Sequence, residues 1–338
     1  MRMRAAWLFL SLLGGLMGLL PAAGITRASP SSARVVAVLD PGKRPEPVIA
    51  DPAHHRVYIG TETGGSVVVV DDRTNRIVRP IPVGREVEDL ALDPAARRLY
   101  AVSSVTSRLS VIDTSTLTVA AVVPNLNHVS GVALDRGRHR LYVAEQNGDT
   151  VAVVDTRTLR VEARIKTPGR PQGIAVDPGP HRVFVGLFAL SRVDVLDETT
   201  NRVIGSIPVG SRPVHPFRID AASHRLYVVS SGSSTLSIIN TRSSTVIRTV
   251  PTGKYPEGLD VHPELNRAYV SNEGDPGTDK NGGHTVSVID LRTGRITDTV
   301  QTPKGPDGVA YDAAAGAIDV SNEDQGHVTV ITLPSRDR

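Results

Sequence analysis

The sequence predicts an all-β fold, a seven-bladed β-propeller in which each blade has four antiparallel strands. Three observations support this fold class. A unit of about 42 residues recurs seven times, its segments alternate apolar and polar residues, and turn-forming residues gather between the segments. A helical repeat of the same length would instead place apolar residues at i, i+3 and i+4.

Each repeat is marked by a residue, usually aspartate, that closes an apolar strand. Successive markers lie 42, 42, 42, 43, 42 and 50 residues apart, and the last interval is longer because of an insertion between Asn272 and His284. The seven markers are Asp51, Asp93, Asp135, Asp177, Asp220, His262 and Asp312.

Two further positions keep a fixed distance from the marker. An arginine stands five residues after it and an aromatic residue seven residues after it, except that the seventh repeat has Ala317 and Asp319 there. The next strand of most repeats ends in aspartate. In an antiparallel pair the start of one strand lies beside the end of the next, so this arginine and this aspartate should be neighbours. We therefore expect ion pairs that fix the register and are covered by the aromatic ring. The expected pairs are Arg98 with Asp113, Arg140 with Asp155, Arg182 with Asp197, and Arg267 with Asp290.

The seventh repeat ends after its third strand, residues 327–332. The missing fourth strand is found at the other end of the chain, because residues 34–45 match the strand and linker at 202–213. We therefore expect the N-terminal strand to close the last blade, which leaves no major sheet edge unpaired. The propeller domain is expected to span residues 34–333, followed by a short tail at 334–338.

These strands carry a family resemblance. Arg-x-Tyr-Val strands at 140–144 and 267–272 precede Thr-Val-x-Val segments at 150–155 and 285–290, and Ile-Pro-Val-Gly linkers stand at 81–84 and 207–210. On these motifs the chain resembles the YVTN-type propeller repeat family over residues 34–333. The resemblance implies a seven-bladed ring of exported or surface proteins and no single activity.

The chain is also similar to lactonase-like seven-bladed propellers, whose strands carry Tyr-Val-Ser-Asn segments like residues 269–272. That resemblance implies an arginine after the asparagine, whereas Glu273 and Glu323 stand there in this chain. A lactonase-like hydrolase is one alternative function. Its general base and acid would come from His215, Glu257, Asp307 and Glu46.

The first 28 residues are typical of a secretory signal peptide. A basic start precedes an apolar run at 5–20, and then come Pro21 and small residues. Cleavage is expected after Gly24 or Ala28, and an uncleaved anchor is the alternative because residues 5–23 come near the length that spans a bilayer. We expect an exported chain, periplasmic or extracellular in a bacterium, with no stable membrane span once it is mature.

Composition narrows the remaining functions. The chain has no cysteine, which excludes disulfides, Cys-ligated zinc and covalent c-type haem, and no cofactor is expected. The net charge is only +3 and the chain has no block of basic residues, so charge does not indicate nucleic-acid binding. We expect the chain to be a monomer. A polyanion or nucleic-acid binder is nevertheless an alternative, through an arginine-rich face formed by Arg97, Arg98, Arg136, Arg138 and Arg140.

The candidate site is one mouth of the central channel. Strand direction alternates, so the entry to the innermost strand and the loop between the second and third strands share one face, here called the mouth face. The position five residues before each marker is expected to ring the channel, with Glu46, Glu88, Ser130, Gln172, His215, Glu257 and Asp307. The loops add Glu62, Glu145, Glu273 and Glu323, with Asn272 and Asn322.

These residues predict an acidic mouth that binds a cation or a cationic ligand, and a solvated rim without a ligand is the alternative. The expected function is non-catalytic binding of an unidentified small molecule or protein.

Two loops on the mouth face depart from the repeat. The insertion at 273–284 offers Asp275, Asp279 and Asn281, oxygen ligands of the kind that a divalent cation such as calcium takes, without the full calcium-loop spacing. In the fourth repeat the loop is apolar. Its Phe188 is expected either to contact a ligand or to pack over the neighbouring blade.

Overall fold

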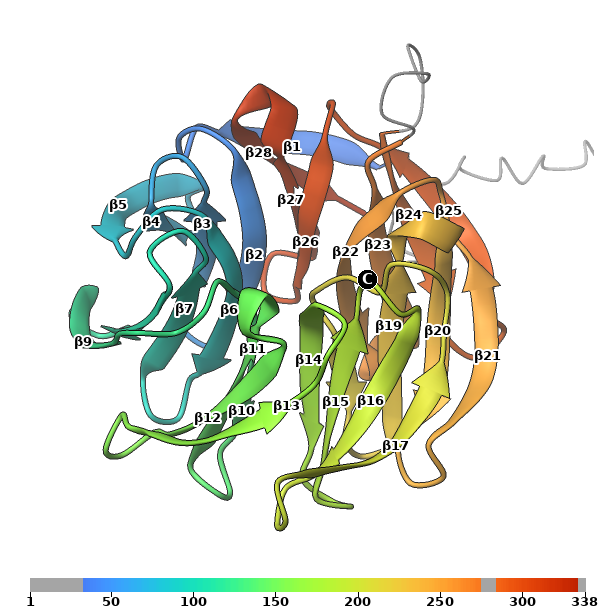
Figure 1. Cartoon of the computed structure of the whole chain (residues 1–338). Helices are drawn as coiled ribbons and strands as arrows, with labels where there is room; N and C mark the ends of the chain where they lie inside the picture. The colour runs from blue at the N-terminus through green and yellow to red at the C-terminus, as the bar shows by residue number, and fades with distance from the viewer. Residues whose placement is uncertain (1–32, 275–283, 334–338) are drawn as a thin grey trace, which may run out of the picture. The chain divides into compact units, whose positions relative to one another are not determined.

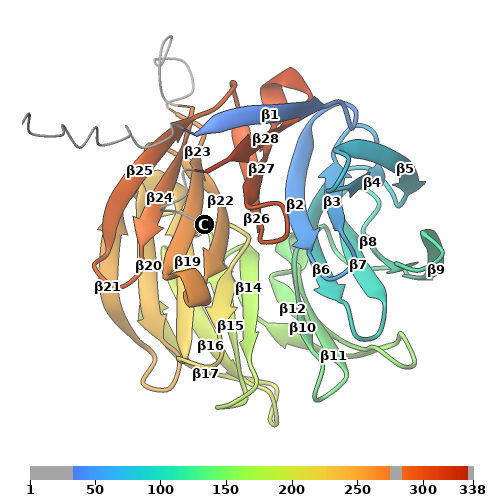
Figure 2. The same cartoon turned by 180° about the vertical axis from the view of Figure 1, so that it is seen from behind.

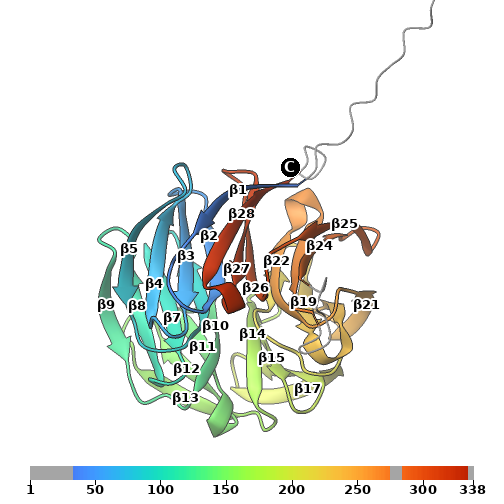
Figure 3. The same ribbon diagram turned by 90° about the horizontal axis from the view of Figure 1, so that it is seen from above.

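The computed structural model describes residues 33–274 and 284–333 of the chain (Figure 1). Its strands form seven four-stranded antiparallel sheets, arranged as the blades of a ring (Figures 1 and 3). The predicted all-β, seven-bladed propeller is therefore confirmed.

Within blades 1 to 6 the strands follow one another outward in chain order. Blades 1 to 3 consist of β2 (Pro45–Asp51), β3 (Arg56–Thr61), β4 (Ser66–Asp71) and β5 (Arg76–Pro82); β6 (Val87–Asp93), β7 (Arg98–Ser103), β8 (Arg108–Asp113) and β9 (Thr118–Val123); and β10 (Val129–Asp135), β11 (Arg140–Glu145), β12 (Thr150–Asp155) and β13 (Val161–Lys166).

Blades 4 to 6 consist of β14 (Pro171–Asp177), β15 (Arg182–Leu187), β16 (Arg192–Asp197) and β17 (Arg202–Pro208); β18 (Arg218–Asp220), β19 (Arg225–Ser230), β20 (Thr235–Asn240) and β21 (Thr245–Pro251); and β22 (Pro256–His262), β23 (Arg267–Asn272), β24 (Thr285–Asp290) and β25 (Arg295–Gln301). β18 is short because Pro213 and Pro216 remove backbone donors just before it.

Blade 7 is built from both ends of the chain. It contains β26 (Pro306–Asp312), β27 (Ala317–Asn322) and β28 (His327–Thr332), and β1 (Arg34–Leu39) pairs antiparallel with β28 as its outermost strand (Figure 2). Arg34 lies opposite Thr332 and Leu39 opposite Val328. The predicted closure by the N-terminal strand is confirmed.

The hydrophobic core lies between blades, because the two faces of each sheet pack against its two neighbours. One core cluster joins Tyr58 and Ile81 of blade 1 to Leu90, Leu99 and Ile112 of blade 2. Inner strands such as β4 are therefore buried on both faces, which explains their continuous valine runs. The outer strand β5 is mostly exposed. We call each interface between neighbouring blades a seam.

The remaining regular elements are short 3₁₀ turns: η1 (Gln146–Gly148), η2 (Ser231–Ser233), η3 (Pro263–Leu265) and η4 (Glu323–Gln325). None of the helices in the described part of the chain has the length and apolarity needed to cross a membrane.

The register predicted for the second and third strands is confirmed, since Arg98 lies opposite Asp113, and Arg140 opposite Asp155. The ion pairs predicted from that register are wrong. Arg98 crosses the seam and donates from Nη1 to the carbonyl oxygen of Thr156 in the next blade, at 2.9 Å.

Other repeats show the same arrangement. The Nη1 group of Arg140 donates to Glu198 O at 3.0 Å, and that of Arg182 donates to Thr241 O at 2.8 Å. Blade 6 differs, since Arg267 lies opposite Asp290 and donates to Thr297 Oγ1 of its own blade at 2.7 Å.

The strand-end aspartates are engaged by their own turns. Asp113 Oδ1 accepts the amides of Ser115 and Thr116, at 2.7 and 3.0 Å. Aspartate favours such local bonds to the backbone, so the arginine is left to satisfy a carbonyl of the neighbouring blade. In blades 1 to 4 the repeated arginine therefore joins neighbouring blades instead of fixing the register within one blade.

Deletion of β1 should prevent ring closure. Without Arg34–Leu39, β28 becomes the open edge of a three-stranded blade, so we expect aggregation and loss of soluble protein, measured by size-exclusion chromatography and thermal melting. Val36→Thr, an exposed substitution that keeps β1 in place, is the control and should leave the melting curve nearly unchanged. Wild-type melting of the β1 deletion would contradict the closure.

Replacement of Arg98 by Met should lower the free energy of unfolding by about 1–3 kcal/mol, the usual contribution of a hydrogen bond to a charged group. Asp113→Asn should be nearly neutral, because an asparagine Oδ1 can accept the same two amides. Urea unfolding of both variants provides the measurement. Equal losses would instead indicate that the two side chains act as an ion pair.

Candidate functional site

Two positions in each blade bring side chains to the mouth face. The rim position is the one five residues before the marker, as Glu46 in β2, and the loop position directly follows the second strand, as Glu62 after β3. A backbone hydrogen bond fixes the loop position, since the amide of Glu62 donates to the carbonyl of Arg44 at 2.9 Å and that of Glu323 to Gly305 at 2.7 Å. Arg44 adopts a φ of 55°, which turns the chain into the rim.

Acidic residues at these two positions gather on one side of the mouth. The side over blades 3 to 5 has no carboxylate at these positions and carries Ser130, Gln146, Gln172, Phe188, His215 and Ser231. The other side is a continuous run over blades 6, 7, 1 and 2. We call this run the acidic arc; its members are Glu257, Glu273, Asp307, Glu323, Glu46, Glu62 and Glu88.

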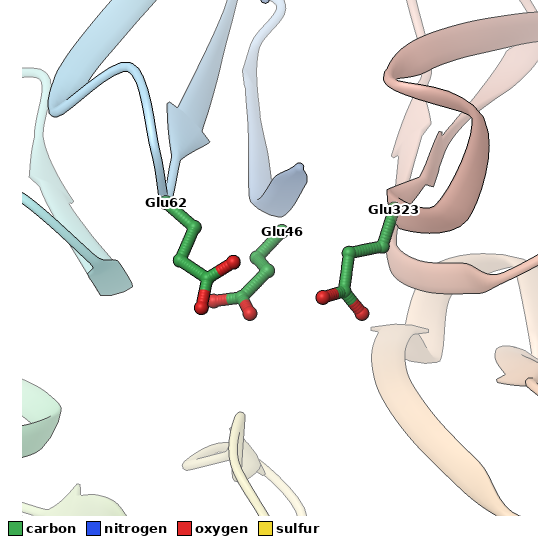
Figure 4. Close-up of side chains that lie close together, drawn as sticks. All are labelled: Glu46, Glu62 and Glu323. Carbon is green, nitrogen blue, oxygen red and sulfur yellow. The ribbon is translucent and has the colours of Figure 1, made fainter. Parts of the chain in front are cut away.

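Three members of the acidic arc converge most closely. Glu46, Glu62 and Glu323 each have a carboxylate oxygen within 4.8 Å of the others (Figure 4). Arg44 forms ion pairs with Glu62 and with Glu323. Within the described residues, no ion pair or side-chain hydrogen bond engages the carboxyl group of Glu46. Such a group can accept a cation, which would have to share its ligands with Arg44.

Burial and crowding raise the pKa values of five acidic-arc residues, Glu46, Glu62, Glu257, Glu273 and Asp307. Burial, followed by the nearby charges of Asp307 and Glu88, holds the pKa of Glu46 well above its usual range. Burial and Asp307 do the same to the pKa of Glu257. Burial and the charge of Glu323 raise the pKa of Asp307 to about 7. Repulsion between like charges in a partly desolvated site is typical of functional sites.

His215 is the cation that faces this arc from blade 5. Its Nε2 lies 3.7 Å from Glu88 Oε2, so the pair crosses from blade 5 to blade 2. Burial lowers the pKa of His215, but the hydrogen bond and charge of Glu88 outweigh it and raise the pKa to about 9. Burial raises the pKa of Glu88, but His215 outweighs it and leaves the pKa below its usual value.

The channel beneath the mouth is narrow. A cavity of about 20 Å³, room for a single water molecule, lies under His215, Glu88 and Asp307. A wider cavity of about 170 Å³ lies further from the mouth, toward the marker residues, and Arg218 lines both cavities. Arg218 is paired with Asp260 at 3.3 Å. A ligand at the mouth would therefore lie on the rim and not pass through the channel.

Phe188 occupies the loop position of blade 4. It is half-buried against the core of blade 5, which agrees with the packing alternative. The guanidinium carbons of Arg170 and Arg212 lie 5.5 and 5.7 Å from its ring centre, within cation–π distance. The side of the mouth over blades 3 to 5 therefore combines an aromatic ring with two flanking cations.

Three residues predicted for the loops of the mouth face lie elsewhere, because each precedes the loop position by one residue and points into the blade. Glu145 is fully buried, pairs with Arg164 at 2.9 Å and accepts from Thr150 Oγ1 at 2.7 Å. Asn272 and Asn322 are fully buried and hydrogen-bonded within their own strands and linkers. Asp275, Asp279 and Asn281 lie outside the described residues.

Sequence reasoning missed two parts of this site. One is Arg44, the counter-ion of Glu62 and Glu323, which stands two residues before the rim position and carries no signal of this role in the sequence. The Arg218–Asp260 pair inside the channel was also missed, since both residues resemble ordinary strand polar residues. The only available signal is that Arg218 and Asp260 belong to the innermost strands β18 and β22, whose side chains can line the channel.

The comparisons with known proteins agree with the fold. No family model and no curated protein matches the chain. Solved structures do match: hydrazine synthase from Kuenenia stuttgartiensis (TM-score 0.73, 18% identity, covering 87% of this chain and 96% of that chain) and the β-propeller domain of Cps50 (Swd1) from Myceliophteria thermophila (TM-score 0.74, 14% identity, 89% and 99%).

At such low identity these matches show the fold alone. The class of protein is therefore a seven-bladed β-propeller. The resemblance to the YVTN-type repeat stays a prediction, because no family model matches the chain.

The raised pKa of Asp307 predicts a stability cost. Its folded-state pKa of about 7 lies above the ordinary 3.8, so the stability it contributes at low pH is lost as the pH rises toward and through 7. Asp307→Asn should therefore be more stable than wild type by about 1–3 kcal/mol at pH 8, and equal to it near pH 3 to 4. Urea unfolding at both pH values measures this, with Asp298→Asn on the outer strand β25 as the control. An equal effect of Asp307→Asn at both pH values would contradict it.

Proposed function

We propose that this chain is an exported, non-catalytic binding protein whose acidic arc holds a cationic ligand. One observation carries the proposal. Among the described residues, no ion pair or side-chain hydrogen bond engages the carboxyl groups of Glu46, Glu257 and Asp307, and their pKa values are all raised. A positively charged ligand would relieve the repulsion that the fold imposes on these groups.

The shape of the arc favours an organic cation with several positive charges. Its carboxylates are spread over four neighbouring blades and form a curved acidic strip along the rim. On the other side of the mouth, Arg170 and Arg212 flank the ring of Phe188 and would repel a cation there. A polyamine fits the acidic strip, because its ammonium groups are spaced along a chain.

The two alternative functions are less well supported. A hydrolase that used His215 as its general base would need a neutral imidazole, whereas the pKa of about 9 keeps His215 protonated at neutral pH. On the arginine-rich face, Arg136 pairs with Asp93 at 3.1 Å, and Arg140 with Glu162 at 3.2 Å. Arginines that are already engaged attract phosphates less.

Export is part of this proposal and rests on the sequence of residues 1–28, with its basic start and apolar run. An exported protein would meet its ligand in the periplasm or outside the cell.

Spermidine should raise the melting temperature of the wild-type protein by mass action. The triple variant Glu46→Gln, Glu257→Gln, Asp307→Asn should fold and lose this shift, because it keeps the shape of the rim and removes its charge. Thermal melting with and without spermidine measures both effects.

The matched control is Glu162→Gln on the outer strand β13, which removes one carboxylate far from the arc and should keep the shift. No shift in the wild type would mean that the arc is a solvated rim. A shift that survives in the triple variant would place the ligand elsewhere.

A further inference from the structure

A third position in each blade reaches the mouth face. It lies in the linker that leads into the innermost strand, and its carbonyl oxygen accepts the amide of the loop position of the same blade. We call it the linker position; it is occupied by Arg44, Glu86, His128, Arg170, Arg212, Tyr255 and Gly305. All seven residues have a positive φ, for example 55° at Arg44, 57° at Arg170 and 54° at Arg212. The three linker arginines therefore leave the backbone in equivalent places, and their surroundings can be compared directly.

Arg44 shows where the side chain of a linker arginine goes. Its guanidinium forms ion pairs with Glu62, at the loop position of its own blade, and with Glu323, at the loop position of the preceding blade. Because the ring repeats the same geometry, a linker arginine in any blade should stand between two loop positions. The charge of that arginine is balanced only where those positions are acidic.

Arg170 and Arg212 stand between loop positions that are not acidic. Arg170 of blade 4 donates from Nη2 to Gln146 Oε1 of blade 3, at 3.2 Å, and its guanidinium carbon lies 5.5 Å from the ring centre of Phe188. The guanidinium carbon of Arg212 in blade 5 lies 5.7 Å from the same ring centre, and the loop position of that blade is Ser231. Both arginines are exposed. Within the described residues, no ion pair engages either guanidinium.

The backbone around this arginine pair is already fixed. Asp149 lies close to Arg170, but its Oδ1 accepts the amides of Gly169 and Arg170, at 3.0 and 2.9 Å, and these bonds hold its pKa below the usual value. The stem of Arg212 packs on Gly232, since a methyl group on that glycine would come within 3.2 Å of Arg212 Cγ and Cδ. Two positive charges therefore flank one ring without an ion-pair partner among the described residues.

Apolar side chains form a wall beside the two arginines. Phe188 is half-buried, and Leu190, which is 46% exposed, lies against Gly169, because a methyl group on that glycine would come within 2.6 Å of Leu190 Cδ1. The turn is held in place, since the amide of Ala189 donates to Gly169 O at 3.1 Å and that of Leu190 donates to Leu187 O at 3.0 Å. Two cations beside an exposed apolar surface fit an anion that carries an apolar body.

We propose that Arg170, Phe188 and Arg212 form an anion site that binds an organic carboxylate with an apolar body. The two guanidinium groups would donate to the carboxylate oxygens, as arginine does in its ion pairs with acidic side chains. The apolar body would cover Phe188 and Leu190 and remove them from water. The ligand would thus supply the negative charge that Arg44 receives from side chains of the protein itself.

This anion site is separate from the acidic arc that the proposed function uses. It lies over blades 4 and 5, whereas the acidic arc lies over blades 6, 7, 1 and 2 (Figure 1). The two sites would bind groups of opposite charge. One proposal can therefore fail while the other is confirmed.

Benzoate is a suitable probe, because it joins one carboxylate to one apolar ring. Isothermal titration calorimetry at constant ionic strength should show saturable binding of one benzoate per wild-type chain. Benzyl alcohol lacks the charge and inorganic phosphate lacks the ring, so each should bind at least about tenfold more weakly. Arg170→Gln and Arg212→Gln should each weaken benzoate binding about tenfold or more, the usual effect of removing one partner of a charge-assisted hydrogen bond.

Two controls accompany these variants. Arg44→Gln is the matched control, because it removes a linker arginine whose carboxylate partners lie within the chain, and it should bind benzoate like the wild type. The variant Glu46→Gln, Glu257→Gln, Asp307→Asn should also keep benzoate binding, although it should lose the response to spermidine. A wild type that binds benzoate and ignores spermidine would contradict the proposed function alone.

Other outcomes would overturn the anion site. A wild type without saturable benzoate binding would mean that the two arginines only cover Phe188. Binding that survives both Arg170→Gln and Arg212→Gln, or that Arg44→Gln weakens equally, would place the carboxylate elsewhere. Phosphate that binds as tightly as benzoate would indicate a site for inorganic anions. Benzyl alcohol that binds as tightly would indicate an apolar site to which the arginines contribute nothing.

Discussion

The seam between neighbouring blades is the contact on which this structure depends. Each sheet is only four strands wide and buries both of its faces against its neighbours, so no blade has a core of its own. The fully buried aromatic residue of strand two fills the seam, and the arginine beside it satisfies a carbonyl of the next blade. A ring of this kind is stable only when all seven seams are formed. The last of them joins blade 7 to blade 1, and the pairing of β1 with β28 inside blade 7 ties the two ends of the chain together.

The reliance on seams leaves the mouth free to vary. Among the described residues, the rim and loop side chains other than Phe188 lie outside the core clusters between blades, so the repeat fixes their position but not their identity. Seven carboxylates on one side of the mouth lower stability through mutual repulsion, as the raised pKa values of Glu46, Glu257 and Asp307 indicate. A fold held by its seams tolerates this cost, and local conflicts of this kind are expected at functional sites.

The sequence predicts the backbone better than the side chains. A repeat imposes the same geometry seven times, so strand bounds, the register of Arg98 with Asp113 and the closing strand all follow from spacing. Spacing does not show which way a side chain points at the end of a strand. Glu145 is buried in the blade, whereas the next residue, Gln146, occupies the loop position on the mouth face. Nor could spacing show that Arg98 reaches across the seam, since the distance between blades is a tertiary property.

Departures from the repeat are informative, because the other blades show which residues the fold itself needs at each position. Blade 7 concentrates such departures. On the mouth face it contributes Asp307 and Glu323 to the acidic arc, and in its seam with blade 1 it exchanges an arginine for carboxyl groups. The strands β26 and β27 connect these two regions directly, and Glu46 begins the strand β2 that packs against them. The position of blade 7 against blade 1 therefore sets the spacing of the converging carboxylates, Glu46, Glu62 and Glu323. Anything that tightens the closing seam also fixes the geometry of the mouth.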